Sequence, residues 1–433
     1  MMTSPIVEIT ALSHEGRGIA HVDGKTVFIE GALPGEQVIF TFTKKHRHYD
    51  EGRVLEIMQA SPQRVVPRCP HFGVCGGCSQ QNFSHELQIQ HKQQILLDSL
   101  LHVGKVTPKT ILPPMLGPIW GYRHKARLGV KFVEKKGKVL VGFREKQGRY
   151  LADIQSCDVL HPSVGKQLIA LSNLVKSLEK YKVIAQIEVA VSDDEVALVF
   201  RNLEALPESD VIKLRDFAQL HQFRIYLQPG GVESVYCLWP ENPGPLYYAL
   251  PDFNLSLAFE PLDFTQINPV INRQLVSLAI QLLDLKSTDR VIDYFCGIGN
   301  FTLAMATVAA SVVGVEGAEQ AIIRARSNAE RNRINNTTFY TSNLMGDLAH
   351  LPWRGDYDKI LLDPPRSGAI ELIQQVPFKA KRIVYVSCNP ATLARDAEAL
   401  IEKHGYKLEA AGIMDMFPHT SHVESIAVFT RAR

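Results

Sequence analysis

The part of the chain after residue 262 alternates between strand-like and helix-like segments, and this alternation limits the possible folds more than any other feature. Four of the strand-like segments, 290–295, 311–317, 359–365 and 382–388, are short and apolar, with stretches of helical period between them. Strands that are apolar on both faces and alternate with helices are typical of a doubly wound, mostly parallel sheet. We therefore expect an α/β domain over residues 263–433, with its ligand at the carboxyl ends of the strands.

The front of the chain differs in both pattern and charge. Residues 5–60 contain short strand-like runs with turns at a spacing of roughly 8–12 residues, which is typical of a small β-barrel. Residues 1–150 hold 21 Lys and Arg against 12 Asp and Glu, a net charge of +9, whereas the remainder holds 26 against 33, or −7. Such a basic region is expected to bind a polyanion. Its loop 44–49 places cations beside an aromatic ring, which suits contact with phosphates and bases, although a solvated hairpin tip could have the same sequence.

Three domains follow from these changes of pattern. We expect a β-barrel over residues 1–61, a central α+β domain over 62–262 and the α/β domain over 263–433. With 45% hydrophobic and 21% charged residues, the composition excludes a wholly disordered or fibrous chain. No apolar run reaches the ~18 residues that a membrane helix requires, and the N-terminus lacks a secretory signal pattern, so we expect a cytoplasmic location and no membrane partner.

A glycine-containing loop after the first α/β strand indicates a nucleoside cofactor. Gly297 and Gly299 let the backbone approach a ligand closely, although this pair alone would also suit a tight turn. A dinucleotide-binding fingerprint would place Gly or Ala at 302, where this chain has Thr302. The following strand ends in Glu316, whose carboxylate can accept hydrogen bonds from both ribose hydroxyls. The combination favours S-adenosylmethionine, which has no pyrophosphate.

Three further strand ends carry side chains suited to chemistry. Asp363 and Arg366 follow one strand, and Cys388 ends the next, directly before Pro390 and a new helix. The field at the helix N-terminus is expected to lower the pKa of this thiol and favour a nucleophilic thiolate, although a lone cysteine is more commonly an inert packing residue. Glu424 brings a carboxylate to the last strand pair, where the alternative is a surface glutamate on a loop.

A cluster of cysteines indicates a metal site in the central domain. Cys69, Cys75 and Cys78 fall within ten residues, and in a reducing compartment such a cluster suggests metal ligation. Three thiolates need a fourth ligand. A set of four thiolates suits either Zn²⁺ or a [4Fe–4S] cluster, and the ligand count does not choose between them. His71 could replace a cysteine, but we interpret it as a surface histidine, and we assign Cys237 and Cys296 to packing.

Several motifs together resemble the RNA uracil-C5 methyltransferases. They are FTQIN at 264–268, DYFCGIGNF, LLDPPRSG, YVSCNPATLARD and HVES, in this order. The N-terminal barrel resembles a TRAM domain, and with the Cys-x5-Cys-x2-Cys cluster it extends the resemblance to nearly the whole chain. The combination is similar to the members of the family that modify large-subunit (23S) ribosomal RNA, because the tRNA enzymes lack both additions.

The resemblance implies a Rossmann-like S-adenosylmethionine-dependent methyltransferase domain that acts on 23S rRNA. Cys388 would attack uracil C6 and Glu424 would remove the C5 proton, while Asp363 could contact either the uracil or the cofactor. The cofactor contacts implied by the family are Gln266, Phe295, Asn300, Glu316, Asn343 and Asp363. The family also implies a [4Fe–4S] cluster on Cys69, Cys75, Cys78 and Cys157, in a structural or RNA-positioning role because methyl transfer requires no electron.

Three other interpretations remain open at this point, and the sequence indicates no protein partner. One is a tRNA uracil-C5 methyltransferase. A radical-SAM RNA methylthiotransferase would also combine a TRAM-like barrel, cluster cysteines and S-adenosylmethionine, but it should have Cys-x3-Cys-x2-Cys in a barrel of repeated βα units. The third is an RNA-binding or iron–sulfur assembly factor without activity, against which the intact Cys388, Glu424 and Asp363 argue.

Overall fold

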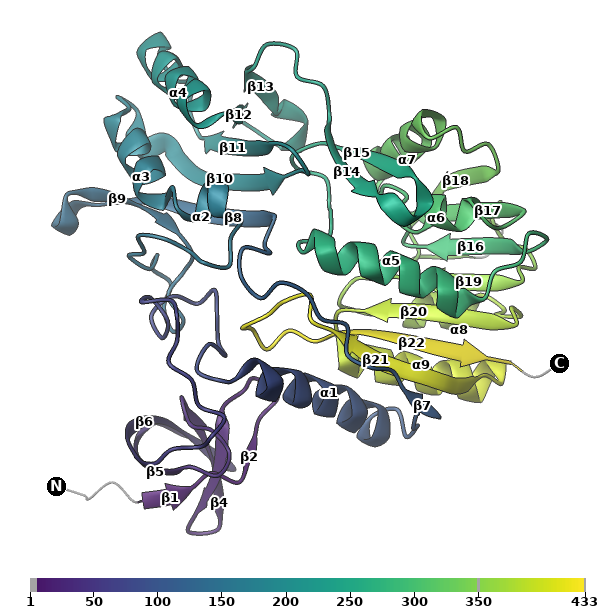
Figure 1. The fold of residues 1–433 in the computed structure, drawn as a ribbon, viewed down its shortest axis with the longest axis horizontal. Helices are drawn as coiled ribbons and strands as arrows, with labels where there is room; N and C mark the ends of the chain where they lie inside the picture. The colour runs from purple at the N-terminus through teal and green to yellow at the C-terminus, as the bar shows by residue number, and fades with distance from the viewer. Residues whose placement is uncertain (1–5, 349–350, 432–433) are drawn as a thin grey trace.

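In the computed structural model, which describes residues 6–348 and 351–431, the N-terminal strands form a curled six-stranded sheet at one end of the molecule (Figure 1). Its strand order is β1-β5-β6-β4-β3-β2. Alternate side chains such as Val27, Ile29, Val38 and Phe40 are fully buried inside the curl, as a period-2 pattern requires. The strands are β1 (Ile6–Glu8), β2 (Ala11–Leu12), β3 (Gly18–Val22), β4 (Lys25–Glu30), β5 (Gln37–Lys45) and β6 (Tyr49–Gln59).

The central unit is a second six-stranded sheet, of order β13-β12-β11-β10-β8-β9, in which only the β11–β12 pair is parallel. Its strands are β8 (Lys125–Val133), β9 (Lys138–Gly142), β10 (Ile184–Val191), β11 (Val196–Asn202), β12 (Phe223–Gln228) and β13 (Tyr236–Trp239). The helices α2 (Pro162–Gly165), α3 (Leu168–Ser177) and α4 (Glu208–His221) accompany it, with the short 3₁₀ turns η1 (Glu134–Lys136), η2 (Tyr181–Val183) and η3 (Val232–Ser234). α3 packs against β9 and α4 against β12.

The C-terminal part forms an eight-stranded sheet of order β18-β17-β16-β19-β20-β22-β21-β7, with buried apolar clusters on both faces. Its first five strands are parallel, as the sequence predicts: β16 (Arg290–Tyr294), β17 (Ser311–Glu316), β18 (Thr337–Thr341), β19 (Lys359–Leu362) and β20 (Arg382–Ser387). The antiparallel pair β21 (Lys407–Met414) and β22 (Glu424–Thr430) follows. The helices are α5 (Pro269–Leu283), α6 (Thr302–Ala306), α7 (Glu319–Arg331), α8 (Ile370–Gln375) and α9 (Pro390–His404).

Segments from before residue 262 also pack on this sheet. The helix α1 (His85–His102), capped by Ser84, lies along α9 and buries Ile95, Leu96 and Leu100 in the apolar cluster that α9 also joins. β7 (Thr110–Ile111) extends the sheet beside β21, and the hairpin β14 (Leu246–Leu250) and β15 (Leu255–Phe259), with its turn η4 (Pro251–Phe253), packs on α7. The packing therefore differs from the expected division at 262, because apolar faces within 84–115 and 246–259 are buried against the methyltransferase-like sheet.

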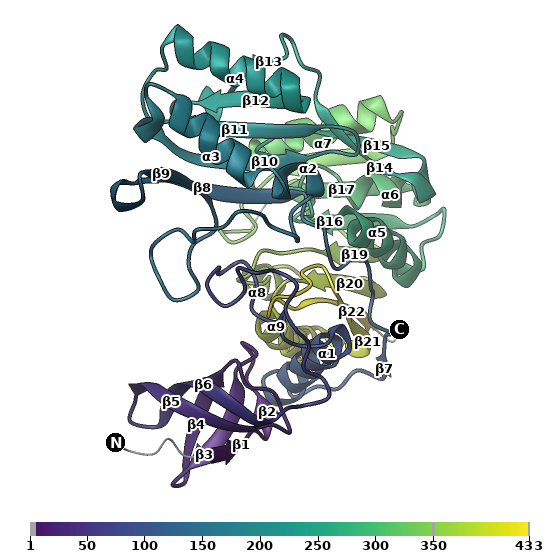
Figure 2. The ribbon, with the colours of Figure 1, turned by 60° about the vertical axis from the view of Figure 1, so that its left-hand side comes forward.

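The loop that enters β22 lies between the barrel and the central sheet in both views of the ribbon (Figures 1 and 2). Over the described ranges, we find no helix with the length and apolar character needed to cross a membrane.

Candidate active site

The loop after β16 folds tightly against the end of β17. Phe295, Gly297 and Gly299 all have positive φ, at 66°, 54° and 94°, and a Phe in this conformation is uncommon. The Phe295 N–H donates to the carbonyl of Val315 at 2.8 Å. The Glu316 carboxylate accepts a hydrogen bond from the Gly297 N–H at 3.2 Å, so the loop and the acidic strand end lie together.

Three carboxyl groups meet at the carboxyl ends of β16, β17 and β19. Asp293 is fully buried, and burial, reinforced by Asp363 and Glu316, raises its pKa to about 8 against the effect of a 2.5 Å hydrogen bond from Thr302 Oγ1. Burial and the Glu316 charge likewise raise the pKa of Asp363 to about 7. Thr302, the residue that departs from the dinucleotide-binding fingerprint, thus donates a hydrogen bond to a buried carboxyl. Asp293 was missed as a site residue, although its place at the end of an apolar strand was a usable signal.

The other expected cofactor residues have different surroundings. Asn300 forms a reciprocal amide pair with Asn272 of α5, at 2.9 and 3.0 Å, and also accepts from Tyr248 Oη at 3.0 Å. Its side-chain oxygen is therefore already satisfied within the protein. Gln266 is half-buried in the loop before α5, and Asn343 is exposed just beyond β18.

Cys388 follows β20 and is half-buried directly before α9. Burial raises the pKa of its thiol to about 11, with further contributions from the Glu424 and Asp363 carboxyls that outweigh the opposing Arg366 charge. The expectation that the helix terminus lowers this pKa is therefore wrong. The reason is that burial and, after it, two neighbouring carboxyls oppose ionisation of the thiol.

Glu424 is the first residue of β22 and lies beside Cys388 because of the strand register. β22 runs antiparallel to β20 with Ser425 opposite Ser387, so the next opposing positions are Glu424 and Cys388. Burial and the Asp363 carboxyl raise the pKa of Glu424 to about 8, against the effects of Arg366 and Lys92. A carboxyl that titrates near neutral pH can take up or release a proton during a reaction.

The four cysteines implied as cluster ligands line one small cavity, together with Phe72, Phe143 and Ile154. The residues are Cys69, Cys75, Cys78 and Cys157, and all four thiols are free of disulfides. Burial raises the pKa of Cys78 to about 12 and that of Cys157 to about 11, and the neighbouring thiolates add to both shifts. In residues 6–348 and 351–431, however, no three His, Cys, Asp or Glu side chains are grouped closely enough to hold a metal ion.

Comparisons with known proteins match the N-terminal barrel and the C-terminal sheet with two separate family models. A family model described as "tRNA (Uracil-5-)-methyltransferase" matches residues 251–343 and 353–432, and a TRAM domain model matches residues 6–55. A protein of Xanthomonas campestris pv. campestris (strain 8004), named "23S rRNA (uracil(1939)-C(5))-methyltransferase RlmD", is 52% identical over 98% of this chain and 96% of its own length. The chain belongs to the RlmD family. A Legionella pneumophila (strain Corby) protein with the same name is 48% identical over 99% of this chain and 98% of its own.

Membership of the RlmD family confirms the resemblance expected from the motifs and the TRAM nature of the barrel. A solved structure supports the fold. The crystal structure of Pyrococcus abyssi tRNA (uracil-54, C5)-methyltransferase in complex with S-adenosyl-L-homocysteine matches with a TM-score of 0.75 at 22% identity, over 98% of this chain and all of that one. This RlmD-family chain therefore has the predicted doubly wound methyltransferase fold.

Proposed function

We propose that this chain transfers the methyl group of S-adenosylmethionine to C5 of a uridine in 23S ribosomal RNA. The placement of Cys388 and Glu424 at opposing register positions beside Asp363 carries the proposal. A thiol paired with a carboxyl of raised pKa supplies the nucleophile and the base that substitution at a pyrimidine carbon requires. The names of relatives about half identical over the whole chain support the choice of rRNA.

The methyl donor would bind at the strand ends that carry Gln266, Phe295, Asn300, Glu316, Asn343 and Asp363. When bound, S-adenosylmethionine supplies an electrophilic methyl group on a positively charged sulfur. The carboxyls of Asp293, Glu316 and Asp363 suit a cationic ligand, and Glu316 can also accept from ribose hydroxyls. Because the Asn300 side-chain oxygen is already paired, we expect this residue to contribute mainly through its backbone.

Cys388 would begin the reaction on the RNA base. Its thiolate adds to C6, which forms the S–C6 bond and leaves an enolate whose C5 is nucleophilic enough to accept a methyl group. Glu424 then removes the proton from C5, the S–C6 bond breaks and the thiolate is released. The charge of Glu316 raises the pKa of Asp363, and Asp363 in turn raises the pKa of Glu424. Asp363 therefore lies near both the residues proposed for the methyl donor and the proposed base.

The RNA must present its target base outside the helical stack, which costs a few kcal/mol. The front of the chain would supply phosphate contacts that offset this cost. In the barrel loop, Lys44, Arg47 and His48 are exposed, and His46 stacks on Tyr49 with ring centroids 4.4 Å apart. This arrangement suits contact with an RNA backbone and an unstacked base.

The four-cysteine cavity would hold a [4Fe–4S] cluster on Cys69, Cys75, Cys78 and Cys157. Burial and neighbouring thiolates raise the pKa values of Cys75, Cys78 and Cys157, so these thiols need a positively charged group to become thiolates, and an iron–sulfur cluster bound by four cysteines provides one. His71 is not required, because its Nε2 accepts a hydrogen bond from the Gln155 N–H at 3.1 Å. The role of the site would be structural.

The direct test is methylation of 23S rRNA and tRNA, both lacking the modification, with methyl-labelled S-adenosylmethionine in air and without a reductant. We expect label in one uridine of 23S rRNA, located by mapping the modified nucleotide. Label in tRNA alone would identify a tRNA enzyme. Activity that requires anaerobic reductant would identify a radical enzyme, and RNA binding without any transfer would identify an inactive binding factor.

A further inference from the structure

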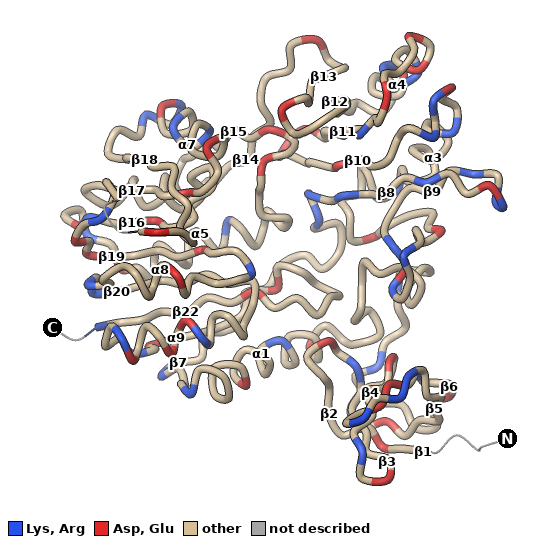
Figure 3. The backbone as a smooth tube through the Cα atoms, turned by 180° about the vertical axis from the view of Figure 1, so that it is seen from behind, with Lys and Arg blue, Asp and Glu red and all other residues tan. Residues whose placement is uncertain are grey.

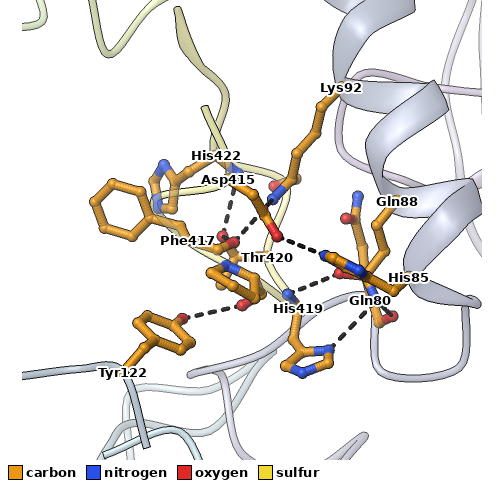
Figure 4. Close-up of polar contacts among 12 residues, drawn as sticks. Gln80, His85, Gln88, Lys92, Tyr122, Asp415, Phe417, His419, Thr420 and His422 are labelled. Carbon is orange, nitrogen blue, oxygen red and sulfur yellow. Dashed lines mark hydrogen bonds and ion pairs between the residues drawn. The ribbon is translucent and has the colours of Figure 1, made fainter. Parts of the chain in front are cut away.

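The loop 415–423 joins β21 to β22 and ends directly before Glu424. Its polar groups are bonded mainly from outside the loop, by segments more than 290 residues earlier in the sequence (Figure 4). The loop residues held in this way are Asp415, Phe417, Pro418, His419 and Ser421. The position of the proposed base therefore depends on parts of the chain outside the methyltransferase fold.

A buried ion pair fixes the first half of the loop. Lys92 of α1 is completely buried, and its Nζ donates to Asp415 Oδ1 at 2.7 Å and to the carbonyl of Phe417 at 2.9 Å. His85 Nε2 lies 2.7 Å from the other oxygen of Asp415. These partners hold the pKa of Asp415 below its usual range despite burial, whereas burial lowers the pKa of Lys92. A buried ion pair adds little to stability, because the loss of hydration offsets the attraction between the charges. We therefore interpret this pair as a device that fixes the position of the loop.

A second set of contacts fixes the residue His419. Its N–H donates to Gln88 Oε1 at 2.8 Å, and its carbonyl accepts from the N–H groups of Ser79 and Gln80 at 2.9 and 3.0 Å. Its ring stacks on Trp120, and its φ of +65° lies in the left-handed region, which is uncommon for residues other than glycine. The loop is thus held in one conformation.

We propose that Lys92 is a positioning residue, which through Asp415 and the Phe417 carbonyl sets the place of Glu424 for proton abstraction. The inference rests on the base role of Glu424 in the proposed function. It predicts that the main effect falls on the proton-abstraction step, because Cys388 is carried by β20 and α9 rather than by the loop. The charged and titratable groups that act on Glu424 are Lys92, Asp363, Arg366 and Cys388.

The test is Lys92→Met in single turnovers on an RNA substrate, with the covalent protein–RNA complex and the released product followed separately. We expect adduct formation at nearly the normal rate, but product release slowed about 10- to 100-fold, as for a misplaced catalytic group. Adduct should therefore accumulate, and the pH at which release becomes half-maximal should rise, because a positive charge near Glu424 is lost. Equal slowing of both steps, or no slowing, would overturn the proposal.

Two further variants keep the result decisive. Lys109→Met removes an exposed ion pair, Lys109 with Glu409 at 2.8 Å, that also links the front of the chain to β21, and it should leave both steps unchanged. If Lys92→Met does not fold, the double variant Lys92→Met/Asp415→Asn leaves no unpaired buried charge and should accumulate adduct. Failure of the double variant to fold would assign the network to the fold itself and overturn the proposal.

Glu424→Gln separates this inference from the proposed function. If Glu424→Gln accumulates adduct and Lys92→Met does not, only the positioning role is wrong. If Glu424→Gln releases product at the normal rate, the proposed base itself is wrong.

Discussion

At the scale of single residues, the thiol of Cys388, the proposed nucleophile, is kept protonated by burial and by its neighbours. The pKa of Cys388 is raised to about 11, and the two carboxyls responsible alongside burial have pKa values of about 8 and 7, for Glu424 and Asp363. The three groups therefore titrate as a coupled set, in which a proton on a carboxyl favours ionisation of the thiol. Such coupling would limit unwanted reaction of the thiol in the absence of RNA.

Neutralising Glu424 should make Cys388 easier to ionise. We expect Glu424→Gln to lower the pKa of the thiol by about one unit, equivalent to roughly 1.4 kcal/mol, because a negative charge beside the thiolate is removed. The rate of alkylation by iodoacetamide as a function of pH measures this, with Cys388→Ala as the control for other thiols. An unchanged midpoint would contradict the proximity of the two groups.

The buried carboxyl of Asp293 should make stability depend on pH. Its pKa is raised from 3.8 to about 8, so the native state keeps a proton that the unfolded chain releases above about pH 4. The stability from this group is complete below pH 4 and is lost as the pH rises through 8, by up to about 1.4 kcal/mol per pH unit. The wild type should lose stability relative to Asp293→Asn between pH 5 and pH 8, so the free energy of unfolding of the variant minus that of the wild type should increase. Parallel plots of the two free energies against pH would contradict this. Taking the difference removes the contribution of other groups, including the buried His419.

At the scale of elements, the site is formed where strands end and helices begin. Asn389 shows this between β20 and α9: its Oδ1 accepts from the Ala391 N–H at 3.1 Å, and its Nδ2 donates to the carbonyl of Arg366 at 3.1 Å. One side chain thus caps the helix that follows Cys388 and attaches the loop after β19. We expect the placement of Cys388, the proposed nucleophile, to depend on both bonds.

Removing this cap should weaken both the fold and the reaction. We expect Asn389→Ala to lower the free energy of unfolding by about 0.5–2 kcal/mol and to slow methylation, because the helix start next to Cys388 loses its partner. Asn389→Asp keeps the acceptor for the cap but not the donor to Arg366, so it should retain most of the stability while still slowing methylation. Urea denaturation and initial rates measure the two effects, and an unchanged rate in Asn389→Ala would show that the cap does not position the thiol.

Local patterns in the sequence predict the elements better than their assembly. The parallel strands follow from short apolar runs, which act over a few neighbouring residues. The opposition of Glu424 to Cys388 depends on the register of an antiparallel pair, and the bond from Lys92 to Asp415 spans 323 residues. Neither long-range pairing leaves a local signal, and the two-residue strand β7 is too short to show a period.

At the scale of the whole molecule, segments from the front of the chain and the methyltransferase sheet are joined through the loop that precedes Glu424. Lys and Arg are densest along β8 and β9 (Figure 3), whereas the strands of the barrel and those of the methyltransferase sheet carry four each. Ser79 and Gln80, which hold His419, directly follow Cys78 of the proposed cluster site. The cysteine site therefore lies at a junction, where its loss should affect more than the binding of iron.

Cys78→Ser should disturb both the cluster and the junction. We expect loss of the brown iron–sulfur absorbance, a lower midpoint of unfolding and weaker RNA binding, because the proposed cluster no longer fixes the segment that holds His419. Cys237→Ser is the matched control, since Cys237 lies outside the cavity and donates to the Pro240 carbonyl at 3.3 Å. Full absorbance in Cys78→Ser would rule out this ligand.

The covalent step can be tested most directly with RNA in which the target uridine is replaced by 5-fluorouridine. After methyl transfer, fluorine at C5 cannot leave as a proton, so the bond between the protein and C6 should persist. We expect a stable protein–RNA complex that depends on S-adenosylmethionine, with the modified nucleotide located on Cys388 by mass spectrometry and no complex in Cys388→Ala. A complex through another residue, or active enzyme that binds this RNA without forming one, would contradict nucleophilic attack by Cys388.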